Sequence, residues 1–265
     1  MAPVIVDDGQ FRPIRRRPRL VLDCTDLAHP GSRTFFDHAA RPDQLLQGAV
    51  DAVLDALYGD VARTGNPSPS PIPPIRCIFL KLHDFGGVAY TCSSDLDPLH
   101  KEMHLSLQYL AGVAERSHSK PEHVALEIRG VVTHEMVHVF QHNGAGTVPG
   151  GVVEGVADWV REKAGVGAPH WKRERPGDDD RWDQGYEKTG FFLDWLSKRV
   201  QRPDLVPALN LAMQDQTWDD GAVLRDLLGG QQVGDLFREY RRSFDTGAGG
   251  GSNPAAPVPT HGPRS

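Results

Sequence analysis

The segment Val131–Gln141 constrains this chain more than any other, because it places ionisable side chains inside an apolar helical pattern. It contains the spacing His-Glu-x-x-His as His134, Glu135 and His138. Residues four apart lie on one face of a helix, so the two imidazoles can bind one metal ion. Glu135 would lie beside that ion, where a carboxylate can take a proton from a bound water. The apolar neighbours predict a buried helix, and zinc explains why polar side chains are buried in it.

A catalytic zinc site needs a third ligand, and the downstream sequence offers several candidates. The metzincin pattern fails, because Gln141 and Gly144 occupy the positions where that pattern has a glycine and a further ligand. His142 cannot complete the set on a straight helix, because it and the first histidine would lie about 12 Å apart along the axis. We interpret His142 as the end of the helix, next to a left-handed stop at Asn143 and Gly144.

The next predicted helix, residues 151–160, carries Glu154 and Asp158 four positions apart on one face. One of them can be the third metal ligand, and the other can be the carboxylate that orients a ligand histidine. We predict that Glu154 is the ligand and Asp158 the orienting residue, and the reverse assignment stays open. The fourth coordination position then remains for water, as in catalytic zinc sites. The alternative is that both acids are ordinary solvated charges on an amphipathic helix.

Several of these segments resemble the plant and bacterial "basic secretory protein" peptidases. The resemblance rests on residues 134–144, 149–151 and 154–161, on the block from Trp182 to Tyr186, and on the strand-like segment 101–106. It covers about residues 20–245 and implies a zincin-type metallopeptidase that uses Zn²⁺ and acts on peptides or proteins. The chain departs from the family in being acidic and in showing no secretory signal.

Tyr186 is the second residue to which we assign a catalytic role, beside Glu135. A phenol that reaches the metal could donate a hydrogen bond to the oxyanion of the tetrahedral intermediate. The alternative is packing, with the hydroxyl at the surface. The resemblance favours the catalytic role.

Two other function classes remain open from the sequence. One is a binding or defence protein in which the zinc site is catalytically silent, and the other is a zinc hydrolase of a non-peptide amide. The general base Glu135 argues against the first, because a closed structural zinc site does not need it.

Charge and hydropathy restrict the partners of the chain. The formal net charge is −6, which argues against a nucleic-acid surface, and the basic run at residues 15–19 is interpreted as a solvated arm. No apolar run approaches the length of a membrane span. The first ten residues lack the pattern of a secretory signal, which favours a cytoplasmic location, although the family is often secreted. We expect a monomer without nucleic-acid or membrane partners.

Three cysteines, Cys24, Cys77 and Cys92, are scattered along the chain. Their odd number and spacing predict neither a disulfide framework nor a metal site, and Cys77 is expected to be a buried thiol. His104, in an alternating segment, is interpreted as a surface or core histidine in preference to a site residue.

The predicted fold is α+β and zincin-like: a small mixed sheet over the active-site helix, followed by a helical C-terminal subdomain. One domain, residues 19–245, is expected between a flexible arm (1–18) and a disordered tail (246–265). Strands are predicted at 20–25, 75–82, 87–91 and 103–108, with 87–91 paired to 75–82, and a loop anchored by Phe35 and Phe36. Helices are predicted at 42–58, from 121 onward, around 186–196, and at 205–213, 222–228 and 233–244.

Overall fold

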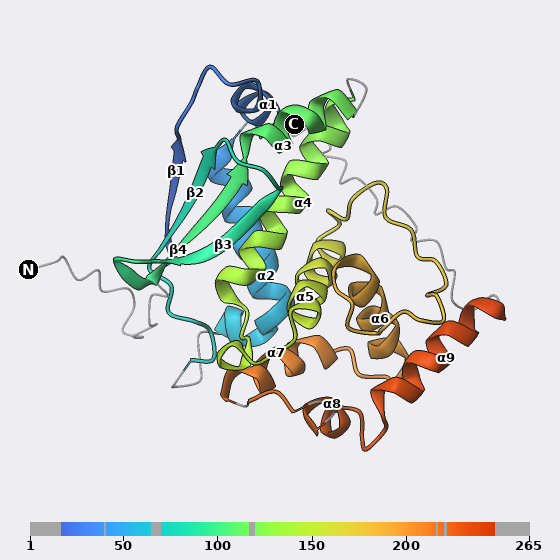
Figure 1. Ribbon diagram of the computed structural model, residues 1–265. Helices are drawn as coiled ribbons and strands as arrows, with labels where there is room; N and C mark the ends of the chain where they lie inside the picture. Colours follow the sequence, from blue (N-terminus) through green and yellow to red (C-terminus); the bar gives the residue numbers. More distant parts are fainter. Residues whose placement is uncertain are drawn as a thin grey trace, which may run out of the picture. The chain divides into compact units, whose positions relative to one another are not determined.

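The computed structural model describes residues 17–39, 41–64, 70–116, 120–215, 217–219 and 222–246 (Figure 1). Most of the predicted arm and tail therefore lies outside the described residues. The chain divides into two compact units, residues 1–142 and 143–265, and each is described by itself. Among the described residues there are four strands and nine α-helices, so the α+β class is confirmed.

The first unit contains a mixed sheet in the order β1-β2-β4-β3. Its strands are β1 (Arg19–Cys24), β2 (Cys77–His83), β3 (Ala89–Ser94) and β4 (Asp97–Ser106). β2 is parallel to both β1 and β4, whereas β3 is antiparallel to β4. The prediction that segment 87–91 pairs with segment 75–82 was wrong. A two-residue connection joins β3 to β4 as a hairpin, and β4 lies between β2 and β3.

Four helices complete this unit: α1 (Pro30–Ala39), α2 (Pro42–Thr64), α3 (Leu107–Arg116) and α4 (Pro121–Phe140). Helices α2 and α4 pack on one face of the sheet (Figure 1). Alternate side chains on that face are buried, namely Ile78, Leu80 and Leu82 on β2 and Met103 and Leu105 on β4. No helix in the described part of the chain is both long and apolar enough to cross a membrane.

Two local predictions in this unit were wrong, and a third was met in part. The loop expected around Phe35 is helix α1, which begins with Pro30 at a position that suits proline. The strand expected to reach residue 108 ends at Ser106, whose hydroxyl accepts a hydrogen bond from the Tyr109 amide and caps α3. The helix predicted to end at residue 58 does lose helical geometry at Gly59, with φ 46° and ψ −119°, and a second helical segment of α2 follows this kink.

The second unit is helical, as predicted. Its elements are the short 3₁₀ helix η1 (Gly144–Gly146) and the helices α5 (Gly150–Lys163), α6 (Tyr186–Arg199), α7 (Leu205–Asp215), α8 (Ala222–Leu227) and α9 (Val233–Asp245). Helices α5 and α6 approach very closely, since a Cβ at Gly155 would lie 2.2 Å from Cγ2 of Thr189. The Thr189 hydroxyl donates to the Trp182 carbonyl at 2.8 Å and accepts from the Gly185 amide at 2.9 Å, so Thr189 is held in place.

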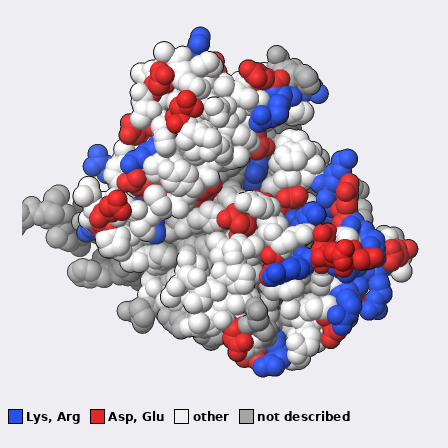
Figure 2. Space-filling model, in the orientation of Figure 1, with Lys and Arg blue, Asp and Glu red and all other residues white. Residues whose placement is uncertain are grey.

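Charged side chains of both signs are interspersed on the face of the second unit drawn in Figure 2. In the segment between α5 and α6, Arg175 pairs with Asp178 at 3.2 Å, and Asp180 pairs with Lys188 of α6 at 3.6 Å. The acidic run at residues 178–180 is therefore partly neutralised by neighbouring cations. Asp178 is exposed, so its ion pair contributes little to stability.

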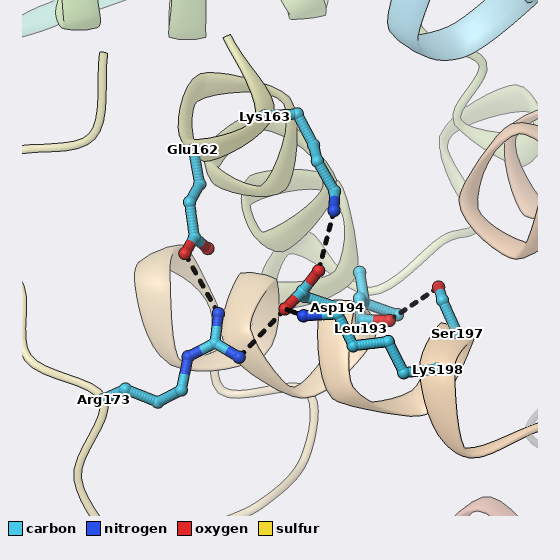
Figure 3. A network of polar contacts seen from close by, with 7 residues as sticks. All are labelled: Glu162, Lys163, Arg173, Leu193, Asp194, Ser197 and Lys198. Atoms are coloured by element: carbon cyan, nitrogen blue, oxygen red, sulfur yellow. Dashed lines mark hydrogen bonds and ion pairs between the residues drawn. The ribbon is translucent and has the colours of Figure 1, made fainter. Parts of the chain in front are cut away.

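The buried Asp194 of α6 receives three cations (Figure 3). Lys163 of α5 lies 2.8 Å from Oδ1, while Arg173 and Lys198 lie 2.9 and 2.8 Å from Oδ2. Arg173 also pairs with Glu162 at 3.0 Å, so the network joins α5, the following loop and α6. Burial alone would raise the pKa of Asp194, but hydrogen bonds from the three cations hold that pKa well below its usual range.

Replacing this carboxylate should destabilise the chain in a pH-dependent way. We expect Asp194→Asn to lower the free energy of unfolding by about 3 kcal/mol at pH 7, because three cations lose their shared partner. Since the pKa of Asp194 is depressed in the folded state, its stabilisation is complete above about pH 5. It declines as the pH falls below about 4, the pKa of an unfolded aspartate.

Urea unfolding of the parent and of Asp194→Asn across this pH range measures the difference. Asp235→Asn, which alters the exposed pair with Arg238, is the matched control and should change stability little. A gap between parent and Asp194→Asn that stays constant from pH 7 to pH 3 would contradict the assignment.

Candidate metal centre and active site

Helix α4 carries the His-Glu-x-x-His spacing within a buried segment, as predicted. It begins with Pro121 and ends at Phe140, and every residue from Gly130 to Val137 is buried. His134 is 9 % exposed and Glu135 is 7 % exposed. Polar side chains with so little solvent contact require partners, and the structure supplies some of them.

The two histidines of the motif face each other across one helical turn. Their Nε2 atoms are 3.2 Å apart and their ring planes meet at 81°. Two nitrogens bound to one tetrahedral ion at about 2.0–2.1 Å would be separated by about 3.3 Å. The observed spacing therefore suits two ligands of a single metal ion.

Gln141 orients the second of these histidines. Its side-chain oxygen lies 3.1 Å from Nδ1 of His138, so Nδ1–H donates and the Nε2 lone pair is directed toward His134. A hydrogen bond of this kind fixes the tautomer of a ligand histidine. The sequence suggested no such role for Gln141, because the bond depends on how the chain leaves the helix.

Glu135 is held by the edge strand β3. The Thr91 hydroxyl lies 2.7 Å from Oε2 of Glu135 and 3.1 Å from the carbonyl oxygen of the same residue. It donates its single proton to one of these acceptors at a time. Thr91 was missed by the sequence analysis, since the contact joins residues 44 positions apart. The alternation of side chains along this half-buried strand could have indicated that the Thr91 hydroxyl points inward.

His142 lies beyond the helix, and the prediction that it forms the helix end was wrong. Gln141 has the extended angles φ −72° and ψ 142°, so α4 stops at Phe140 without a left-handed glycine. Nε2 of His142 instead donates to the Pro71 carbonyl at 2.8 Å, in the segment before β2. This contact accounts for the histidine without a metal.

The remaining candidate residues belong to the second unit. Glu154 and Asp158 lie one turn apart on α5, as predicted; Asp158 is 3 % exposed and Glu154 is half-buried. Tyr186 opens α6 with φ 50°, directly after Gly185 with φ 107°. A non-glycine residue in the left-handed region is uncommon and costs free energy, which proteins tolerate most often at functional positions. The Tyr186 side chain is 57 % exposed, so it adds little to the packed core.

Comparison with protein-family models matches residues 17–240 to the BSP family, described as a peptidase of plants and bacteria. The chain belongs to this family. The resemblance seen in the sequence is therefore confirmed, and protein substrates follow from the family description. The comparisons with curated proteins and with solved structures each found no match.

The contact between Thr91 and Glu135 can be tested through stability. We expect Thr91→Val, which keeps the shape and removes the hydroxyl, to lower the free energy of unfolding by about 1.5 kcal/mol, because a buried carboxylate loses a donor. Thr91→Ser retains the hydroxyl and should stay closer to the parent in urea unfolding. Equal stability of the parent and Thr91→Val would show that the hydrogen bond contributes nothing.

Proposed function

We propose that this member of a peptidase family is a zincin-like, zinc-dependent metallopeptidase that hydrolyses peptide bonds with water as the nucleophile. The observation that carries the proposal is the pair of facing imidazoles on α4 beside a buried, positioned carboxylate. A catalytically silent binding protein would not need a carboxylate held beside the two histidines, so this feature favours an enzyme.

The proposed metal ligands are His134, His138 and Glu154. Two imidazoles and one carboxylate are a usual ligand set of catalytic zinc, and the 3.2 Å spacing of the histidine nitrogens fits it. Asp158, one turn from Glu154, is proposed as the carboxylate that orients a ligand histidine. When bound, zinc would polarise the scissile carbonyl and lower the pKa of a water molecule toward about 7.

The protein's own side chains would move the protons. Glu135 takes a proton from the attacking water and passes it to the leaving amine, so the carboxylate must stay oriented through both transfers. Thr91 provides that orientation through its hydrogen bond to Oε2. Tyr186 is proposed to donate a hydrogen bond to the oxyanion of the tetrahedral intermediate.

Cleavage of a mixed peptide library, read by mass spectrometry, tests the proposal. We expect the parent to cleave and Glu135→Gln to lose at least about 10²-fold in kcat/KM, because the general base is gone. The zinc bound by the two α4 histidines should be unchanged in Glu135→Gln and lost in His138→Ala, which lowers the zinc content by one equivalent per chain.

The outcomes separate the rival functions. Zinc binding without peptide cleavage by the parent would exclude the peptidase assignment and favour a silent binding protein or a hydrolase of other amides. Cleavage by Glu135→Gln at the parent rate would exclude the proposed mechanism while leaving the peptidase itself in place.

Further variants test the assignments in the second unit. Tyr186→Phe should lower kcat about 10²-fold with little change in KM or zinc content, because only an oxyanion donor is removed. Glu154→Gln should lose the zinc bound by the two α4 histidines, whereas Asp158→Asn should weaken the binding of that ion about 10- to 100-fold. Retention of zinc by Glu154→Gln together with its loss from Asp158→Asn would reverse the two roles.

A further inference from the structure

The face of the sheet that points away from α4 carries a second set of metal-ligating side chains. Successive side chains on a strand alternate between faces, so the inward Thr91 of β3 is followed by the exposed, outward Cys92. On β4, the buried Met103 separates the two less buried residues Glu102 and His104. The strand register places Cys92 directly opposite Glu102.

The distances among these three side chains fit one ion. Sγ of Cys92 is 3.9 Å from Nε2 of His104, and that nitrogen is 3.4 Å from Oε2 of Glu102. All three ligand atoms lie within 4.8 Å of one another. Tetrahedral zinc with bonds of about 2.3 Å to sulfur and about 2.0–2.2 Å to nitrogen and oxygen separates its ligand atoms by about 3.3–3.6 Å. Small side-chain shifts would complete the coordination.

His104 is held by two neighbours that leave Nε2 directed at the cluster. Nδ1 lies 2.9 Å from Nε2 of His83 on β2, and the ring stacks on Tyr90 with centroids 4.4 Å apart and planes 6° apart. Ligand histidines usually engage their second nitrogen in this way.

We propose that Cys92, His104 and Glu102 bind Zn²⁺ or another divalent transition metal that accepts thiolate and imidazole ligands. The site lies on the face of the sheet opposite to His134 and His138, and it does not depend on the proposed catalytic centre. It joins the edge strand β3 to β4, so a bound ion would fasten the hairpin that carries Thr91. The interpretation of His104 as a residue without a site role is revised accordingly.

The Lys81 ammonium would compete with a metal ion for the carboxylate of Glu102. This ammonium lies 2.6 Å from Oε2 of Glu102, the oxygen that faces His104. A divalent ion must share or displace this cation, so removing the charge of Lys81 should tighten binding. This expectation has the opposite sign to that for any ligand variant, which makes Lys81→Met a discriminating test.

Titration of the intact chain with Co²⁺ tests the proposal. A thiolate bound to Co²⁺ gives an intense charge-transfer band in the near ultraviolet, which the histidines and carboxylates of α4 and α5 cannot produce. We expect this band with one equivalent per chain in the parent and in Glu135→Gln, its displacement by Zn²⁺, and its loss in Cys92→Ser. Cys24→Ser, which changes another free thiol, is the matched control and should keep the band.

Affinities from the same titration identify the other participants. His104→Gln should weaken binding by at least about 10-fold and His83→Gln by about 10-fold. Lys81→Met should tighten it several-fold. No band in the parent at saturating Co²⁺, a band that survives Cys92→Ser, or unchanged affinity in His104→Gln would each overturn the proposal. None of these readouts uses peptide cleavage, so the site and the proposed peptidase can fail separately.

Discussion

The hydrogen bond between Thr91 and Glu135 ties the edge of the sheet to the buried carboxylate of α4, and the order of the strands makes that contact possible. A carboxylate that is 7 % exposed in an apolar helix requires a donor, and the donor comes from the edge strand of the sheet. β3 reaches α4 because β4 lies between β2 and β3 and carries the hairpin to that edge. Sheet order and general base are thus linked, since a hairpin placed beside β2 would present a different strand to the helix.

In the second unit, close packing and buried ion pairs fix the position of α5 against α6. Small residues bring the two helices together, as at Gly155, and a single buried carboxylate, Asp194, gathers cations from both helices and from the loop between them. Helix α5 also carries Glu154 and Asp158. The orientation of these two acids within their unit therefore depends on how α5 packs against α6.

Local patterns predicted much of this structure, and non-local pairings account for what they missed. The helix of His134 and His138, the helix of Glu154 and the C-terminal helices follow from apolar periodicity within one segment. The partner of β3, the hydroxyl of Thr91 beside Glu135 and the amide of Gln141 on His138 depend on register or on the path of the chain after a helix. Helices α1 and α3 were missed because their start signals, Pro30 and the capping Ser106, lie in segments that also suit loops and strands.

Two adjacent residues of β3 face opposite sides of the sheet, and this imposes a condition on how the hairpin forms. A slip of one residue would exchange the two faces, placing the Cys92 thiol against Glu135 and the Thr91 hydroxyl among Glu102 and His104. Such a slip would leave polar side chains on both faces of the sheet without their native partners. Polar contacts on both faces of this short strand therefore stabilise the native register of β3 against β4. They favour that register more strongly than the alternation of apolar residues alone would do.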